Sequence, residues 1–422
     1  MKKICLFGLG HIGLPTACLL ATQGYEVVGI DTSEEVVGAV NRGEELFEEP
    51  ELGVLLQDAL TSNNLRAKTE PEAAHVFLIT VPVLLNIKNK MSDLTNMRAV
   101  AEVIRHQLKK HDLVILESTV PLGTSEKVLL PLLEKSGLKC GRDFYLAHCP
   151  ERAMPGSTVH EIIYNDRIIG GINRKSAILA RELYSCFVKG NFYLTDLRTA
   201  EMVKLVENTS RDVNIALANE FAEIAEESGV NIWEIIELAN KHPRVNILRP
   251  GPGVGGDCLP RDPWFLTENS TKSNRIVPLA REINNLMPNH VLTLAKMLLK
   301  GIDNPTITIL GIAYKGDVDD TRETPVLKFI KLAQDEGFKV KIHDPVVKRF
   351  EYELYPLAEA AQSSDCLVII TDHTQFKQID PEEISYLMRN RNVIDTRGIL
   401  NQRKWRRAGF KLKVLGDGTC IS

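Results

Sequence analysis

The stretch Lys3-Ile4-Cys5-Leu6-Phe7-Gly8-Leu9-Gly10-His11-Ile12-Gly13 decides the fold of this chain. Its apolar residues up to Gly8 predict a short strand, and the apolar run from Pro15 to Thr22 predicts a helix directly after the glycines. A second strand is expected from Tyr25 to Ile30, ending at Asp31. Strand, glycine turn, helix and strand together indicate a βαβ unit.

The glycine turn has the spacing GxGxxG, in which each glycine has a different physical task. Gly8 permits the tight turn, Gly10 lets a pyrophosphate approach the backbone, and Gly13 lets helix and strand pack closely. His11 and Ile12 lie within the same loop. Asp31 ends the next strand, where a carboxylate accepts hydrogen bonds from ribose hydroxyls and repels a 2′-phosphate. The pattern therefore predicts a dinucleotide site that prefers NAD to NADP.

Further apolar runs predict a parallel sheet wound with helices in residues 1–195. These runs are Val76–Val81, Leu113–Ser118 and Phe144–Ala147. From Thr199 to Gly229 the apolar residues recur at helical spacing, with Thr199 as the expected N-cap and Gly229 as the stop. A helix of that length spans about 45 Å. Shorter helices are expected at Ile232–Asn240 and Ile276–Leu299.

The last part of the chain returns to alternating strands and helices. Strands are expected at Thr306–Ile312, Lys339–His343, Cys366–Thr371, Asn392–Ile394 and Leu412–Leu415. Thr324 and Pro325 predict the N-cap and first turn of a helix that stops at Gly337. The predicted fold is α/β: two Rossmann-like doubly wound domains, residues 1–195 and 301–422, joined by a helical middle, residues 196–300, with one long central helix.

Composition narrows the function classes. The chain has 422 residues, 44% hydrophobic and 25% charged, with a formal net charge of -4. These values exclude a small disulfide scaffold and argue against a general nucleic-acid or anionic-membrane binder. The eight cysteines form no CxxC pair and no metal-like grouping with histidine, so no metal site is predicted. Cysteines within apolar runs favour a reducing cytoplasm.

Two polar features stand apart from this scaffold. Lys204 and Asn208 are four residues apart and thus share a face of the long helix, although such a pair is more often simply solvated. The segment Gly251-Pro252-Gly253-Val254-Gly255-Gly256-Asp257-Cys258 forms a loop whose backbone can approach a ligand closely. Cysteine is a strong nucleophile, so this loop presents Cys258 as a candidate for covalent catalysis.

Along nearly its whole length the sequence resembles the UDP-glucose/GDP-mannose dehydrogenase family, and most closely the branch that acts on UDP-N-acetyl-D-mannosamine. The matching segments, in order, are residues 8–13, Ser118–Thr124, His148–Gly156, Ala200–Glu220, His242–Leu248, Gly251–Phe265 and Leu310–Pro325. The resemblance implies oxidation of a sugar-nucleotide C6 alcohol to a carboxylate by two successive NAD molecules, supplying an acidic sugar for surface polysaccharide.

The same resemblance implies roles for individual residues. Cys258 is the nucleophile that forms a thiohemiacetal and then a thioester. Lys204 and Asn208 surround the reacting oxygen, and Asp262 positions a water or accepts a proton; whether Lys204 itself takes the first proton stays open. Glu151, with Thr119, serves thioester hydrolysis as a general base acting through water.

Binding roles follow in the same way. Thr80, Pro82, Thr119 and Arg322 join the glycine loop in the expected NAD site. The expected contacts to the UDP-N-acetylhexosamine come from Glu151, Arg152, Lys204, Asn208, Arg244, Gly255, Lys315 and Arg397, with Arg322 as a further phosphate candidate. In related enzymes the arginine matching Arg244 can reach across from the neighbouring subunit, which implies a homodimer or higher homo-oligomer.

Departures from the family pattern are few. Arg261 replaces a frequent lysine before Asp262, and Asp257 adds a negative charge beside the nucleophile. In Thr80-Val81-Pro82-Val83 the second threonine of the family's turn is absent, which removes one expected cofactor contact.

Three alternatives remain open from the sequence. They are the same chemistry on UDP-N-acetylglucosamine or UDP-glucose, a two-electron 3-hydroxyacid dehydrogenase, and a non-catalytic NAD-sensing protein. The last two have no use for Cys258, so the stoichiometry of oxidation separates them from the main hypothesis.

Overall fold

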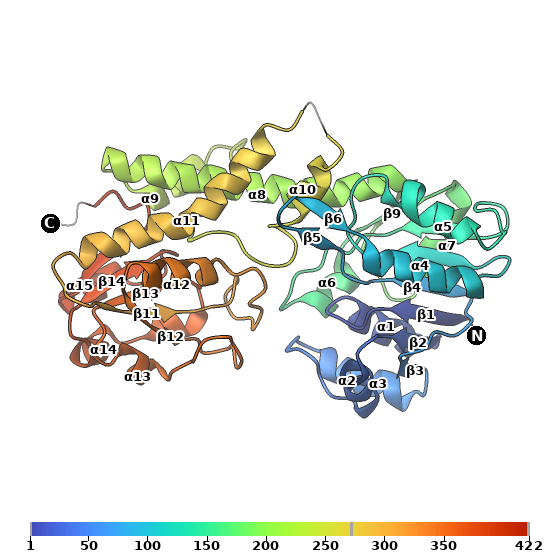
Figure 1. The fold of residues 1–422 in the computed structure, drawn as a ribbon, viewed down its shortest axis with the longest axis horizontal. Coiled ribbons are helices and arrows are strands. Elements are labelled where there is room, and N and C mark those ends of the chain that lie inside the picture. The colour runs from blue at the N-terminus through green and yellow to red at the C-terminus, as the bar shows by residue number, and fades with distance from the viewer. Residues whose placement is uncertain (1, 271–272, 420–422) are drawn as a thin grey trace. The chain divides into compact units, whose positions relative to one another are not determined.

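The computed structural model describes residues 2–270 and 273–419 (Figure 1). These residues form two compact units. The first contains residues 1–207 and 261–271, and the second contains residues 208–260 and 272–422. Each unit is described by itself below.

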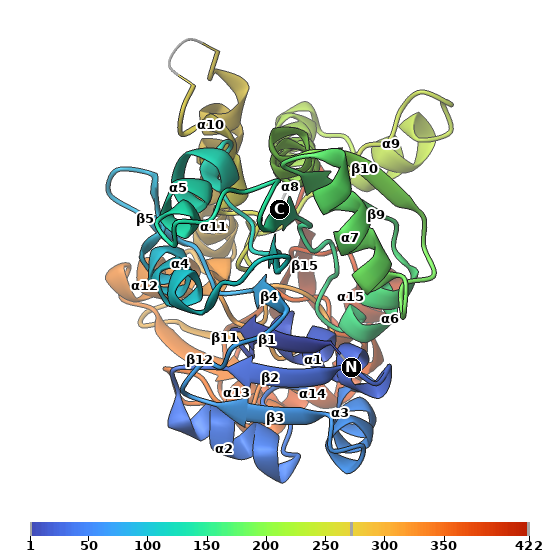
Figure 2. The ribbon, with the colours of Figure 1, turned by 90° about the vertical axis from the view of Figure 1, so that its right-hand side faces the viewer.

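The first unit is built on an eight-stranded sheet with the order β10-β9-β8-β7-β4-β1-β2-β3. All neighbouring pairs are parallel except β8 and β9, which are antiparallel. Figure 2 shows β1, β2 and β3 side by side. The strands are β1 (Lys3–Phe7), β2 (Glu26–Ile30), β3 (Leu65–Lys68), β4 (Val76–Ile79), β7 (Leu113–Leu116), β8 (Tyr145–His148), β9 (Arg167–Gly171) and β10 (Phe192–Asp196).

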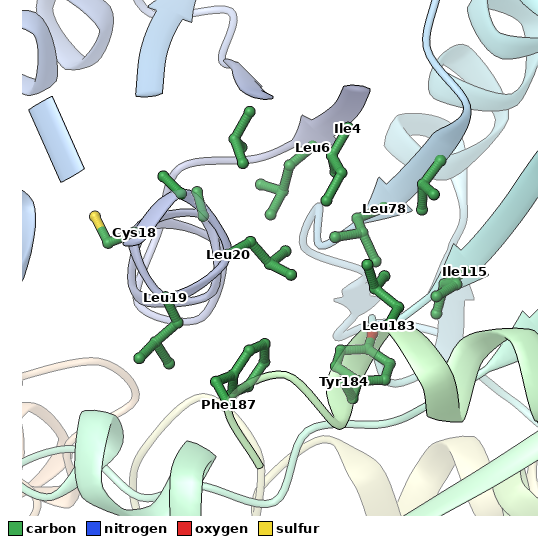
Figure 3. Close-up of a cluster of buried hydrophobic side chains, with 14 of the residues drawn as sticks. Ile4, Leu6, Cys18, Leu19, Leu20, Leu78, Ile115, Leu183, Tyr184 and Phe187 are labelled. Carbon is green, nitrogen blue, oxygen red and sulfur yellow. The ribbon is translucent and has the colours of Figure 1, made fainter. Parts of the chain in front are cut away.

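Alternation along each strand divides the core of the first unit into two layers. Ile4 and Leu6 of β1 point to one face, whereas Cys5 and Phe7 point to the other. Figure 3 shows Ile4 and Leu6 with Leu20 in the first of these layers. Helices α1 (Gly13–Thr22), α2 (Glu34–Arg42), α3 (Leu52–Thr61), α6 (Thr158–Tyr164) and α7 (Arg174–Tyr184) cover that face.

The opposite face of this sheet is covered by a second set of helices. It consists of α4 (Thr95–Gln107), the π-helical turn η1 (Ser125–Leu129), α5 (Leu130–Glu134), α10 (Asp262–Thr267) and the first turns of α8. Phe265 of α10 is fully buried in this layer, which explains why residues 261–271 belong to the first unit. A separate antiparallel hairpin, β5 (Leu84–Asn86) with β6 (Met91–Asp93), projects between β4 and α4 in sequence.

The second unit contains a five-stranded, fully parallel sheet with the order β12-β11-β13-β14-β15. Its strands are β11 (Thr306–Leu310), β12 (Lys339–His343), β13 (Cys366–Ile369), β14 (Asn392–Asp395) and β15 (Lys411–Val414). One face packs against α9 (Ile232–Ala239), α11 (Ile276–Leu298), α12 (Pro325–Asp335) and the last turns of α8. The other packs against α13 (Leu357–Ala361), η2 (Thr374–Gln378), α14 (Pro381–Leu387) and α15 (Gln402–Arg407).

The long helix α8 runs from Leu197 to Ser228. Asp196, not Thr199, caps its start: Asp196 Oδ1 accepts the Thr199 amide at 2.9 Å, and Oδ2 accepts the Thr199 hydroxyl at 2.7 Å. The predicted N-cap was therefore wrong by three residues. The capping carboxylate lies at the end of β10, a strand that was not predicted from the sequence. Gly229 has φ of +68° and ends the helix as predicted.

The predicted fold class is confirmed, with one mostly parallel sheet, one fully parallel sheet and one long helix. The antiparallel β8–β9 pair and the β5–β6 hairpin were not predicted. The boundaries at 195/196 and 300/301 stay a prediction, since the helical middle is shared between the two units. The seven cysteines within the described residues are free thiols; Cys420 lies outside them. In the described part of the chain, no helix is long and apolar enough to cross a membrane.

We predict that Asp196→Ala lowers the free energy of unfolding by about 1 kcal/mol at neutral pH, because it removes the cap of α8. The Thr199 hydrogen bond lowers the pKa of Asp196, so this stabilisation is present above the ordinary value of 3.8 and is lost as the pH falls below it. Urea denaturation measures the difference. Thr199→Ala is the matched control and should cost less, since the backbone amide still donates; a larger loss in Thr199→Ala would contradict this assignment.

Candidate active site

The glycine turn after β1 has the geometry of a phosphate-binding turn. Gly8 has φ of +97°, and its amide donates to Ile30 O at 2.8 Å. An ideal Cβ on Gly13 would lie 1.8 Å from Gly8 O, so α1 requires glycine there. By contrast, a Cβ on Gly10 would meet no atom within 4 Å. The space beside Gly10 is therefore open to a ligand, as the pyrophosphate role requires.

The carboxylate of Asp31 is held at the end of β2 by two backbone amides. Leu9 N donates to Oδ2 and Ser33 N donates to Oδ1, each at 3.0 Å. Helix α1 begins after Ile12 without a side-chain cap, which leaves its N-terminus to a ligand anion. The ring of His11 stacks on Phe47 at 4.1 Å. These features fit NAD, with Asp31 placed next to the glycine turn.

The turns after β4 and β7 complete the carboxyl edge of this sheet. The Thr80 hydroxyl donates to Phe7 O and Gly8 O, at 2.8 Å each, so it ties the β4 turn to the glycine turn. Pro82 is exposed and accepts from Asn96 Nδ2 at 3.2 Å. Thr119 is half-buried, two residues beyond Glu117 after β7. Because β1 and β4 pair where the strand order reverses, a dinucleotide is expected at this edge.

Glu201 of α8 anchors the loop that follows Thr119, a role that was not predicted. Its carboxylate accepts the Ser125 amide at 2.7 Å and also accepts the Gly123 amide. Glu201 is 1% exposed, and burial raises its pKa. Local spacing offers no signal for this contact, since its partners are more than 70 residues apart.

Glu151 and Arg152 lie in the loop after β8, and both are engaged. Glu151 Oε1 accepts the amides of Arg152 at 2.6 Å and Ala153 at 3.0 Å, and its Oε2 lies 2.7 Å from Arg167 Nη2. Arg152 makes a bidentate contact to Glu207 of α8, at 3.0 and 2.6 Å. The carboxylate of Glu151 is thus oriented by two amides and a buried guanidinium, while the substrate contact expected of Arg152 stays a prediction.

Lys204 lies on α8 and is 8% exposed. No carboxylate in the described residues of the first unit forms an ion pair with it. Asn208 follows four residues later on the same helix, just beyond the division between the units. Asp262 opens α10, is fully buried, and lies 3.5 Å from Arg261 Nε. A buried ammonium without a counter-charge in its own unit is suited to stabilising a developing oxyanion.

In the second unit, the glycine-rich loop docks on the segment that follows β11. The Gly256 amide donates to Arg322 O at 2.9 Å. A Cβ on Gly255 would lie 2.7 Å from Tyr314 Cβ and 2.8 Å from Glu323 O, and one on Gly256 would lie 3.0 Å from the Tyr314 ring. The two motifs, separate in sequence, are therefore in backbone contact, and this is possible only with glycine.

A buried polar chain that was not predicted holds the start of this loop. The Gly251 amide donates to Asn219 Oδ1 at 2.9 Å, and Asn219 Nδ2 donates to Asn284 Oδ1 at 2.9 Å. Asn284 Nδ2 in turn donates to Asp212 Oδ1 at 2.8 Å, which also accepts Arg281 Nη1 at 2.6 Å. Burial raises the pKa of Asp212, and Arg281 opposes that shift. The chain fixes the loop relative to α8 and α11.

Cys258 is half-buried near the end of this loop. Its neighbour Asp257 lies 3.8 Å from Arg322 Nη1, and Arg322 Nη2 lies 2.6 Å from Asp320. Burial opposes the charged form of Arg322, but the bond to Asp320 outweighs it and holds the pKa above its ordinary value. The negative charge that Asp257 adds beside the nucleophile therefore faces a permanent cation.

The other expected substrate cations are spread along the second unit. Arg397 follows β14, donates from Nε to Ile370 O at 2.8 Å, and has its pKa lowered by burial. Lys315 is half-buried after β11. Arg397 and Lys315 both lie at the carboxyl edge of the sheet, where an open α/β fold binds ligands. Arg244 is exposed in the loop after α9. The described residues hold no group of three metal-ligating side chains.

Comparison with known proteins finds three family models that match successive parts of this chain. They describe the UDP-glucose/GDP-mannose dehydrogenase family: its NAD binding domain matches residues 2–188, its central domain 198–286 and its UDP binding domain 308–402. The matched segments contain the glycine turn, the nucleophile loop and the β11 segment, respectively.

Similar proteins are found along the full chain. A UDP-N-acetyl-D-mannosamine dehydrogenase of Methanococcus aeolicus is 48% identical over 99% of this chain and 96% of its own. The solved structure of UDP-D-ManNAc dehydrogenase from Pyrococcus horikoshii has a TM-score of 0.93 at 43% identity, covering 99% of both chains. An NDP-N-acetyl-D-galactosaminuronic acid dehydrogenase of Ralstonia nicotianae is 42% identical over 96% of this chain and 97% of its own.

We predict that Gly10→Ala and Gly13→Ala have different effects on thermal stability and on NAD binding. The open space at Gly10 tolerates a Cβ, so Gly10→Ala should keep the thermal stability of the protein but weaken NAD binding about tenfold or more, because the methyl group occupies the pyrophosphate position. Gly13→Ala should lower both the thermal stability and the NAD affinity, since its Cβ would overlap Gly8 O. Calorimetric titration with NAD and thermal unfolding measure the pair. Unchanged NAD affinity in Gly10→Ala would contradict this placement of the phosphates.

Proposed function

The chain belongs to the UDP-glucose/GDP-mannose dehydrogenase family, and from this premise we propose that it oxidises C6 of UDP-N-acetyl-D-mannosamine to the carboxylate, using NAD. The product is UDP-N-acetyl-D-mannosaminuronate. The observation that best supports the proposal is the backbone docking of the Cys258 loop against the segment after β11, because it presents a nucleophile at the carboxyl edge of a nucleotide-binding type of sheet.

The proposed reaction oxidises one carbon twice. The C6 alcohol first loses a proton from oxygen and a hydride from carbon. Cys258 Sγ then adds to the resulting aldehyde carbon and forms a thiohemiacetal, because an aldehyde must become tetrahedral before it can give up a second hydride. Loss of that hydride gives a thioester, and water releases the carboxylate and the free thiol. Bound NAD accepts one hydride in each oxidation, so two NAD are reduced per sugar.

The remaining residues stabilise charge and move protons in this scheme. The Lys204 ammonium and the Asn208 amide stabilise negative charge on the reacting oxygen. Asp262 positions a water or accepts a proton. The first proton goes either to that water or to a neutral Lys204 amine, which the proton converts into the ammonium that stabilises the oxygen. Glu151 takes the proton of the hydrolytic water, with Thr119 beside that water. The buried guanidinium of Arg167 lies 2.7 Å from Glu151 Oε2 and orients this carboxylate.

The choice of sugar rests on the relatives. Proteins named for UDP-N-acetyl-D-mannosamine align over nearly the full length at up to 48% identity. One named for an N-acetyl-D-galactosaminuronic acid is 42% identical, so the substrates to be tested include the corresponding C6 alcohol, UDP-N-acetylgalactosamine. UDP-N-acetylglucosamine and UDP-glucose remain the alternatives raised by the sequence, since a single epimeric hydroxyl is a small difference for a pocket to enforce.

Two further parts of the proposal concern setting and assembly. We propose that the product serves surface polysaccharide synthesis in the cytoplasm, where the free thiols of the described cysteines would persist. We also propose a homodimer or higher homo-oligomer in which Arg244 contacts the substrate of a neighbouring subunit. Arg244 is exposed within the described chain, which leaves it accessible to such a ligand.

We predict that purified protein forms two NADH per molecule of UDP-N-acetyl-D-mannosamine consumed, run to completion with excess NAD. The parallel substrates are UDP-N-acetylglucosamine, UDP-N-acetylgalactosamine and UDP-glucose, for which slower oxidation is expected. A ratio of one, with release of an aldehyde or ketone, would favour the two-electron dehydrogenase. NAD binding without turnover on any of these sugars would favour the sensor.

A further inference from the structure

Three buried side chains form a contiguous cluster behind Glu151 in the first unit. Arg167 of β9 has a side chain only 4% exposed, and its Nη2 lies 2.7 Å from Glu151 Oε2. The guanidinium carbon of Arg167 lies 4.8 Å from the centre of the Tyr184 ring. The Tyr184 hydroxyl on α7 donates to Glu117 Oε1. Glu117, Tyr184 and Arg167 are called the Arg167 cluster below.

Tyr184 belongs to the apolar layer on one face of the sheet, as do Ile115, two residues before Glu117, and Ile169, two residues after Arg167. Tyr184 is fully buried among the residues of that layer (Figure 3). Glu117 is 2% exposed, directly after β7, and its second carboxylate oxygen has no hydrogen-bond partner among the described residues. Burying an ionisable side chain without full pairing is costly, so this placement calls for an explanation.

The cluster holds one permanent cation, Arg167, and one carboxyl group, Glu117, and it adjoins the carboxyl group of Glu151. Burial raises the pKa of Glu117 to about 7, and the negative charge of Glu151 adds to this increase. The charge of Arg167 and the hydrogen bond from Tyr184 act in the opposite direction. Cys149 Sγ lies 3.8 Å from Arg167 Nη1, but burial raises its pKa to about 12 and keeps it a neutral thiol. Burial and Glu117 likewise hold the pKa of Tyr184 well above its ordinary value. Of Glu117, Cys149 and Tyr184, Glu117 therefore has the pKa nearest neutrality.

We propose that the Arg167 cluster positions Glu151 and sets its strength as the base that hydrolyses the thioester, with Glu117 as the adjustable charge. This inference rests on the proposed function. Glu117, Tyr184 and Arg167 are positioning residues, since each acts on the reaction only through Glu151.

The charges of Glu117, Arg167 and Glu151 determine how the rate of hydrolysis should change with pH. In hydrolysis, a water oxygen bonds to the thioester carbon, Glu151 takes the water proton, and the C–S bond breaks with its electron pair going to Cys258; nothing is oxidised or reduced. When Glu117 is protonated, Arg167 has Glu151 as its main counter-charge and weakens it as a base. When Glu117 ionises, Arg167 is shared and negative potential is added at Glu151. Hydrolysis should therefore accelerate as the pH rises through the ionisation of Glu117.

The test is rapid mixing of the full-length protein with NAD and UDP-N-acetyl-D-mannosamine, between about pH 6 and 9, with NADH followed by absorbance. Both hydride transfers precede hydrolysis, so slow hydrolysis appears as a burst of two NADH per active site followed by a slow steady state.

Glu117→Gln and Tyr184→Phe keep the buried cation and nearly the same volume. We expect both to retain the burst and KM, and to lose about tenfold in steady-state rate, out of the roughly 10²–10⁴-fold that a general base supplies. Glu117→Gln should also lose the rise with pH.

Asp112→Asn is the matched control. Asp112 is also a buried carboxylate whose pKa is raised by burial, but it lies at the amino end of β7, opposite to Glu117. Its substitution should leave the burst, the steady state and the pH profile unchanged.

Two outcomes would overturn the role of the cluster while leaving the proposed function intact. One is a wild-type rate and pH profile in both Glu117→Gln and Tyr184→Phe. The other is an equal loss in Asp112→Asn, which would point to a general effect of buried charge. Absence of any NADH from the wild-type protein would instead overturn the proposed function itself, and this inference with it.

Discussion

Helix α1 approaches the turn after β1 so closely that only a hydrogen atom fits between Gly13 and the Gly8 carbonyl. This contact places the start of the helix at the carboxyl end of β1, beside β4, where the strand order of the sheet reverses. The Thr80 hydroxyl donates to the same carbonyl, so the turns after β1 and β4 are fixed together. The cofactor contacts expected in the first unit depend on this geometry. The glycine turn positions the phosphates, donates the Leu9 amide to the Asp31 carboxylate, and is bonded by Thr80 to the turn that contains Pro82.

The second unit meets the same need for close backbone approach by a different means. Its glycine loop lies against Tyr314 and the backbone of Arg322 and Glu323, and side chains would prevent that contact. A buried chain of amides and carboxylate, from Gly251 through Asn219 and Asn284 to Asp212, holds the loop at its start. Because Asn219 and Asp212 lie on α8 and Asn284 lies on α11, this chain ties the position of the Cys258 loop to both helices.

Local patterns predicted the scaffold of this protein well. The strands made of apolar runs, the GxGxxG turn, Asp31 and the long helix follow from local patterns alone, since each depends on neighbours within a few residues. The cap of α8 by Asp196, the anchoring of a loop by Glu201 and the Glu117–Tyr184 bond were missed. The last two join residues 67 or more positions apart, and no local pattern marks them. The nucleophile loop was identified by its glycines and its family resemblance, whereas the reason for those glycines became visible only in their contacts.

The central claim is that Cys258 carries the substrate carbon through the second oxidation. The most direct measurement is the mass of the wild-type protein, quenched with acid during turnover of NAD and UDP-N-acetyl-D-mannosamine and then digested. The account predicts a sugar-nucleotide acyl adduct on the peptide that contains Cys258, absent from Cys258→Ser under the same conditions. Formation of two NADH per sugar with the Cys258 peptide unmodified, and equal turnover by Cys258→Ser, would contradict it.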